Sequence, residues 1–150
     1  MVLRKKISSI SIGLFVLSVL FTLTSCGSNS INILMKSTED SNEMNAVQIK
    51  IYQLRSSEKF QLANRESLLR NAGETLGEDL IPNSKVEKIM IPGESYNIAN
   101  IDVTDETKYI GIVGDFFSPA KDKWLQLIDI SEGHDDITVI IGKNFLSVTE

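Results

Sequence analysis

The sequence predicts a mainly all-β protein, an antiparallel β-sandwich of about eight short strands with a short helical insertion between strands. Two observations predict it. Short apolar segments rich in β-branched residues recur along the chain from residue 33, and some of them alternate with polar residues. Turn-forming sequences such as Pro92-Gly93 separate these segments. After removal of a leader the chain keeps about 120 residues, enough for one hydrophobic core and no more.

The first two strands are expected before residue 55. Residues 33–35 form a brief apolar run that fits a first strand, and residues 38–45 are polar enough to form an exposed loop. Apolar and polar residues alternate over 47–52, which predicts a second strand with one face turned inward. The alternation slips at Gln53-Leu54, as it does at a strand end or a bulge.

The spacing then changes from strand to helix and back. Over 57–70 the apolar residues lie nearer helical spacing, and Asn71-Ala72-Gly73 provides a helix stop signal. The 109–114 run is almost continuously apolar and is therefore expected in the middle of a sheet. Gly142-Lys143-Asn144 indicates a final hairpin. Strands are expected after the helical insertion at 85–91, 96–103, 109–114, 124–129, 137–141 and 145–148.

Residues 1–25 have the layout of a secretory signal peptide. Arg4, Lys5 and Lys6 form a basic start, and a mostly apolar stretch follows over 7–23. That apolar stretch is shorter than the about 20 residues needed to span a bilayer. The alternative is a short N-terminal transmembrane anchor.

The end of this leader resembles a lipobox, the cleavage and lipidation motif of bacterial lipoproteins. An apolar residue and two small ones precede the only cysteine of the chain, in the order Leu23, Thr24, Ser25, Cys26. With one cysteine no intrachain disulfide can form, and a lipid acceptor explains Cys26 better than a redox thiol does. We expect a lipidated tether at 26–31. Gly27 stands where an Asp would indicate inner-membrane retention, so outer-membrane anchoring on the periplasmic side is favoured.

The charge of the mature part excludes two classes of partner. The chain has 15 basic and 20 acidic residues, of which the leader carries three basic and none acidic. A strongly acidic domain repels nucleic acid and anionic headgroups, so neither is an expected partner. The lipid on Cys26, the one covalent group expected, must therefore do the membrane binding.

The residues give little support to an enzyme. His134 is the only histidine, and it is followed by Asp135 and Asp136 in an apparent loop. Zinc sites usually need three or four protein ligands, so a solvated loop is the preferred interpretation and no metal or other cofactor is expected. A Ser-His-Asp hydrolase would need this same histidine, and the chain has no Gly-x-Ser-x-Gly elbow. Gly111 and Gly114 fall inside a strand, where glycine often marks a bulge or a close approach of another group.

Three aromatic residues leave a second alternative open. Phe116, Phe117 and Trp124 could line the pocket of a periplasmic ligand-binding lipoprotein. In a sandwich of this size such rings more often belong to the core, so no small-molecule substrate is expected.

Taken in order, these motifs resemble the TssJ family, the outer-membrane lipoproteins of type VI secretion systems, over nearly all of the mature chain. The motifs that carry the resemblance are the 47–54 strand ending in Tyr-x-Leu, Phe60 at the start of the insertion, Leu76-Gly77 with Leu80 at its exit, Ile91-Pro92-Gly93-Glu94, the 109–113 strand followed by Phe116 and Trp124, and the final Gly142-Lys143-Asn144 hairpin. The resemblance implies a transthyretin-like sandwich over 32–150.

The resemblance also implies a role without catalysis. Members of the family bind the periplasmic C-terminal region of TssM, and through it are linked to TssL, so that the complex bridges both membranes. The loop between the first two strands contributes to that contact. Here the loop residues are Thr38, Glu39, Asp40, Ser41, Asn42, Glu43, Met44 and Asn45. A close alternative is a pilotin or assembly factor of a different envelope machine.

Overall fold

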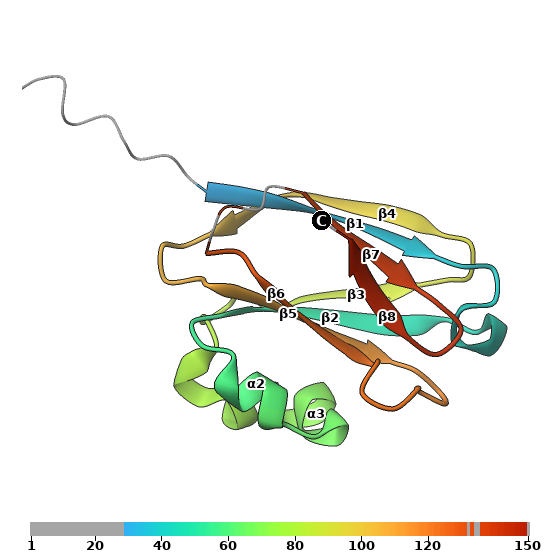
Figure 1. Cartoon of the computed structure of the whole chain (residues 1–150), viewed down its shortest axis with the longest axis horizontal. Helices are drawn as coiled ribbons and strands as arrows, with labels where there is room; N and C mark the ends of the chain where they lie inside the picture. Colours follow the sequence, from blue (N-terminus) through green and yellow to red (C-terminus); the bar gives the residue numbers. More distant parts are fainter. Residues whose placement is uncertain (1–28, 132, 134–135, 150) are drawn as a thin grey trace, which may run out of the picture.

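Two four-stranded sheets pack face to face, and helices cover the outer face of one of them (Figure 1). The structure, a computed structural model of the chain, describes residues 29–131, 133 and 136–149. The elements are β1 (Asn29–Ser37), η1 (Ser41–Met44), β2 (Val47–Leu54), α2 (Glu58–Leu62), α3 (Arg65–Leu76), η2 (Gly77–Asp79), β3 (Val86–Met90), β4 (Ser95–Val103), β5 (Tyr109–Asp115), β6 (Leu125–Asp129), β7 (Asp136–Ile141) and β8 (Leu146–Thr149). The predicted sandwich with a helical insertion is confirmed.

The strand order is β4-β1-β7-β8 in one sheet and β3-β2-β5-β6 in the other. Strand β5 lies inside its sheet, as its continuous apolar run predicts. All named pairs are antiparallel except β1 and β7, which run parallel. Period-two alternation is the same for both orientations, so the sequence pattern could not reveal this parallel pair.

Strand β1 begins earlier than the sequence suggests. It starts at Asn29, inside the 26–31 segment expected as a tether, and Ser30 and Ile31 pair with Asp102 and Ile101 of β4. Ile31 is buried in the core between the sheets. The part of the expected tether that the structure describes is therefore sheet.

Strand β2 continues without a bulge through the position where its alternation slips. Gln53 pairs with Ile110 and Leu54 with Tyr109 in unbroken register. The slip arises because this end of the strand is buried on both faces, with Ile51 facing the other sheet and Tyr52 and Leu54 beneath the helices. A strand covered on both sides has no polar face to alternate with.

Helix α3 runs past its expected stop. Asn64 caps its start by accepting a hydrogen bond from the Ser67 backbone N–H at 2.9 Å. At Asn71 the backbone leaves helical geometry, with φ −132° and ψ 41°, yet the helix resumes and ends at Leu76, just before Gly77, whose φ is +53°. Burial of Leu68 and Leu76 on either side of this kink holds the second half against the sheet.

The apolar interior has two layers. The larger lies between the sheets, and a smaller cluster, Tyr52, Leu54, Phe60, Leu68, Leu76 and Val113, lies between the second sheet and the helices. Phe60 packs directly on Gly111, where an added Cβ would lie 2.6 Å from the ring, so this strand glycine does mark a close approach. Tyr52 donates to the Leu68 carbonyl at 2.9 Å, and burial raises the pKa of Tyr52 to about 12.

The predicted final hairpin is present, with β7 and β8 paired and joined through Gly142-Lys143-Asn144. The predicted turn at Pro92-Gly93, with φ +75° at the glycine, connects β3 of one sheet to β4 of the other. No helix in the described part of the chain is both long and apolar enough to cross a membrane.

Candidate functional surface

Four connections between strands meet at one end of the sandwich, which we call the distal end: the β1–β2 loop (38–46), the β3–β4 turn (91–94), the β5–β6 loop (116–124) and the β7–β8 turn (142–145). Figure 1 shows this end opposite the point where the chain enters β1. Thr38 joins the β1–β2 loop to the β3–β4 turn and to the end of β7 through its backbone. Its N–H donates to the Ile141 carbonyl at 2.9 Å, and its carbonyl accepts from Gly93 at 3.2 Å.

The β1–β2 loop contains a short left-handed turn. Three successive residues have positive φ, with 45° at Asn42, 56° at Glu43 and 63° at Met44. L-residues other than glycine rarely adopt this geometry, and asparagine tolerates it best. The turn persists because side chains replace the hydrogen bonds that a regular element would supply.

Buried Asn42 is the main support of this turn. Its Nδ2 donates to the Ala46 carbonyl at 2.6 Å, and its Oδ1 accepts from the Phe117 backbone N–H at 2.7 Å. Asn45 closes the turn from the other side by donating to the Asn42 and Glu43 carbonyls. The amide of Asn42 thus ties the β1–β2 loop to the β5–β6 loop, 75 residues away.

A hydroxyl pair attaches the loop to the end of β1, and a second hydroxyl bonds within the loop. Ser37 Oγ donates to Ser41 Oγ at 2.6 Å, and both side chains are buried. Thr38 Oγ1 donates to Asp40 Oδ1 at 2.7 Å. A hydrogen-bonded pair satisfies the buried hydroxyls and fixes the direction in which the loop leaves the strand.

The eight predicted loop residues differ in exposure. Ser41 and Asn42 are buried and support the loop, Thr38 is partly buried, and Glu39, Asp40, Glu43, Met44 and Asn45 are exposed. Together with Lys143, three of the exposed side chains, Asp40, Glu43 and Met44, line a hollow of about 390 Å³.

The side chain of Glu39 lies against the β3–β4 turn and does not line the hollow with Asp40 and Glu43. Its carboxylate packs against the β3–β4 turn, where a Cβ added to Gly93 would lie 2.8 Å from Glu39 Oε1. Within the turn itself, Glu94 accepts from the Ile91 backbone N–H at 2.9 Å and pairs with Lys88 at 2.9 Å. These two interactions hold the pKa of Glu94 below its usual value.

Sequence reasoning missed that Phe117 belongs to this end as a surface residue. Phe116 is buried in the core, as predicted, but Phe117 is 82% exposed, so its assignment to the core is wrong. Trp124 is partly buried and packs against both apolar clusters. The sequence did carry a signal for this difference: Phe116 and Phe117 are adjacent, and adjacent residues at a strand end point to opposite faces, so both rings could not lie in the core.

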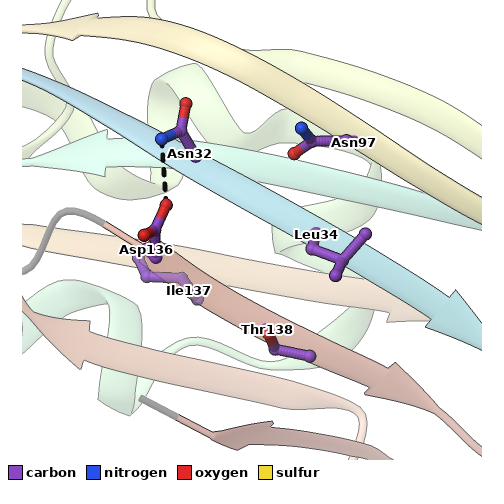
Figure 2. A pocket seen from close by; sticks show the side chains of 6 residues that line it. All are labelled: Asn32, Leu34, Asn97, Asp136, Ile137 and Thr138. Atoms are coloured by element: carbon purple, nitrogen blue, oxygen red, sulfur yellow. Dashed lines mark hydrogen bonds between the residues drawn. The ribbon is translucent and has the colours of Figure 1, made fainter.

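A second hollow lies on the outer face of the first sheet (Figure 2). It measures about 290 Å³ and is lined by Asn32, Leu34, Asn97, Asp136, Ile137 and Thr138. Figure 2 shows Asn32 reaching across from β1 to Asp136 on β7, where its Nδ2 donates to Oδ1 at 2.9 Å. Asn32 Oδ1 also accepts from the Asn100 N–H at 3.0 Å. These polar groups bind one another, which supports the parallel strand pair; neither hollow is lined by Trp124, Phe116 or Phe117.

Several predicted site residues lie outside the described part of the chain. They are Cys26 and the lipobox residues Leu23, Thr24 and Ser25, together with His134 and Asp135. Within residues 29–131, 133 and 136–149, no group of three or more His, Cys, Asp and Glu side chains could hold a metal ion.

Comparison with known families gives one match that spans most of the chain. A family model described as "Type VI secretion lipoprotein, VasD, EvfM, TssJ" matches residues 22–144, a range that includes the predicted lipobox, strands β1 to β7 and the helical insertion. A search of the curated proteins finds no match.

Solved structures share the fold. TssJ1, a type VI secretion lipoprotein from Pseudomonas aeruginosa, is 20% identical with a TM-score of 0.74, over 81% of this chain and 95% of that one. Lip, described as a membrane-bound component of the type VI secretion system of Serratia marcescens, is 16% identical with a TM-score of 0.69, over 82% and 99%. A chain of a structure described as the TssM C-terminal domain from EAEC is 20% identical with a TM-score of 0.68, over 81% and 98%.

Proposed function

We propose, from the premise that this chain belongs to the TssJ family of type VI secretion lipoproteins, that it is an adaptor anchored in the outer membrane. It faces the periplasm, is held by lipid on Cys26, and binds the periplasmic C-terminal region of TssM through its distal end. By that contact it helps assemble the TssJ–TssL–TssM membrane complex. It acts by binding alone, without catalysis or a cofactor beyond the lipid.

The placement of the β1–β2 loop carries this proposal. The described chain begins at Asn29, three positions after Cys26, and β1 runs nine residues from there to the start of the loop. Nine extended residues span about 30 Å. The lipid and the loop therefore belong to opposite ends of one strand, so a molecule moored at Cys26 directs the distal end away from its membrane.

The rigidity of the loop supports a binding role as well. The loop is held by hydrogen bonds that Asn42 and Thr38 make with three other connections, so little conformational entropy remains to be lost on binding. Because the displayed side chains include Asp40 and Glu43, we expect the matching TssM surface to carry basic groups, which would speed association at low salt.

The test replaces the displayed acids while leaving the supporting residues intact. Asp40→Ala with Glu43→Ala should weaken binding of the purified TssM C-terminal region about tenfold, with less salt dependence than the wild type, by titration calorimetry. The control, Glu74→Ala with Asp105→Ala, removes the same charge from exposed positions outside the distal end and should bind normally. An affinity unchanged in the first variant, or equally reduced in both, would place the contact elsewhere.

A further inference from the structure

One peptide group at the distal end is held from both sides. The carbonyl of Phe116 accepts a hydrogen bond from Arg65 Nη2, and the N–H of Phe117, on the same peptide, donates to Asn42 Oδ1 at 2.7 Å. Arg65 is the first residue of helix α3, whereas Asn42 belongs to the β1–β2 loop. The helical insertion and the loop thus fix this peptide together.

The other contacts of Arg65 hold its side chain at this peptide. The same Nη2 donates to Asp115 Oδ1, an ion pair at the end of β5. Its Nε is buried and finds no hydrogen-bond partner among the described residues. A buried donor left without a partner costs about 1–3 kcal/mol. The orientation of the guanidinium is therefore set by its contacts to the β5–β6 loop, at the expense of its own solvation.

The result is a large aromatic side chain displayed from a fixed backbone. Phe117 is 82% exposed, next to Phe116, which is 1% exposed and packs over Gly114. Exposure of a whole phenyl ring gives no stability to the isolated domain. Rigid aromatic side chains are, in contrast, the residues that most often dominate the affinity of protein interfaces.

Phe117 does not stand alone at this end. Met44 from the β1–β2 loop is 77% exposed and Ile91 from the β3–β4 turn is 57% exposed. Each of the three comes from a different connection of the distal end, and Met44 lies beside Asp40 and Glu43 in the hollow described above. Apolar side chains bordered by acids fit a partner with an apolar cleft and basic groups at its rim.

We propose that Phe117 is a principal contact for the periplasmic region of TssM, inserting into an apolar cleft there, and that Arg65 is a positioning residue that fixes its backbone. This inference rests on the proposed function and extends the binding surface from the β1–β2 loop to the β5–β6 loop. A second copy of this chain is a poorer occupant, because Asp40 and Glu43 of the two copies would repel each other. The helical insertion thereby gains a role in recognition through a hydrogen bond, without touching the partner.

The first experiment compares two exposed apolar residues in the mature domain. Phe117→Ala should weaken binding of the purified TssM C-terminal region at least tenfold, as truncation of a central interface aromatic does. Leu62→Ala is the matched control, because Leu62 is 88% exposed on α2 and lies outside the distal end. It should bind normally. Equal affinities for wild type and Phe117→Ala would overturn the proposal, and so would an equal loss in both variants.

The second experiment separates positioning from general stability. Arg65→Met keeps the apolar stem and removes the donors, and we expect about three- to tenfold weaker binding in a domain that still unfolds cooperatively. In the Phe117→Ala background the same change should have no further effect, because Arg65 acts through Phe117. Arg65→Lys, which retains one charged donor, should restore part of the affinity. Additive losses from Arg65→Met and Phe117→Ala would remove the positioning role.

The two levels of the proposal fail in different ways. If Asp40→Ala with Glu43→Ala weakens binding and Phe117→Ala does not, TssM binds the β1–β2 loop alone and the inference about Phe117 is wrong. If the wild-type domain does not bind the TssM region at all, the proposed function itself is wrong. Light scattering of the free domain at the same concentrations would reveal self-association, and a dimer lost in Phe117→Ala would assign the surface to a second copy instead.

Discussion

The two ends of the sandwich are built alike and display different surfaces. At the distal end Asn42 uses its amide to join the β1–β2 and β5–β6 loops. At the opposite end, where the chain enters β1, buried Gln53 of β2 has a comparable role: its Nε2 donates to the Asp102 carbonyl at 2.9 Å and its Oε1 accepts from Thr107 Oγ1 at 3.0 Å. Each amide satisfies one donor and one acceptor and joins segments that are distant in sequence.

The difference lies in what the fixed loops present to solvent. Thr104, Asp105, Glu106 and Lys108 are the exposed residues of the β4–β5 connection, all of them polar or charged. The distal end exposes Met44, Ile91 and Phe117. A rigid loop is thus not by itself a sign of function, because both ends have one. Rigidity combined with exposed large apolar groups distinguishes the distal end, and this combination supports the proposal that it is the recognition surface.

The largest effect is expected from removing the membrane attachment, which should leave binding at the distal end intact. Cys26→Ser should abolish lipidation, remove the protein from the outer-membrane fraction and prevent type VI secretion, because the lipid is the expected membrane contact. The purified mature domain should still bind the TssM region with unchanged affinity, since the distal end is untouched. Retention of Cys26→Ser in the outer membrane, judged by fractionation, would contradict the assigned anchor.

The next test alters the two buried amides in turn. Asn42→Ala leaves the Phe117 N–H and the Ala46 carbonyl without this partner and places alanine at positive φ, so the free energy of unfolding should fall by about 2–4 kcal/mol. Gln53→Ala should cost about 1–3 kcal/mol for the same reason, without the backbone strain. Denaturant titrations would measure both.

Binding should separate these two variants. At a temperature where both remain folded, Asn42→Ala should lose most of its affinity for the TssM region, whereas Gln53→Ala should keep it. Similar affinities would mean that the geometry of the β1–β2 loop does not matter for recognition.

The smallest expected effect concerns pH at the β3–β4 turn. The pKa of Glu94 is lowered from 4.5, first by the Ile91 N–H and then by Lys88, so it is lower in the folded than in the unfolded chain. Ionised Glu94 therefore stabilises the fold above about pH 4.5, and this contribution disappears as the pH falls through the folded pKa. Thermal midpoints between pH 7 and 3 should decline less steeply for Glu94→Gln. A parallel decline in both proteins would assign the acid sensitivity to other groups, among them Glu87.

Local sequence patterns were sufficient for most of the fold. Alternation predicted β2, a continuous apolar run predicted central β5, and Pro92-Gly93 marked the β3–β4 turn. Each of these signals lies within a few residues of the element it specifies. The expected stop at Asn71-Ala72-Gly73 became a kink instead, because burial of Leu68 and Leu76 outweighs a weak local signal.

The surface was less predictable because distant residues shape it. The exposed loop over 38–45 was identified from composition, but its left-handed turn depends on the bond from Phe117 to Asn42, which joins residues 75 apart. Likewise Phe117 is adjacent to buried Phe116, and only the contacts of Arg65 and Asn42 establish which ring faces solvent. Hydrogen bonds between distant loops leave no periodic signal in a single sequence.

Hydrogen–deuterium exchange of the mature domain, alone and with the purified TssM C-terminal region, tests the central claim most directly. The account predicts slower exchange on binding for the amides of 38–46, 91–94 and 116–118, with 104–108 and helix α2 unchanged. Protection confined to 104–108 or to α2, with the distal amides unaffected, would contradict it.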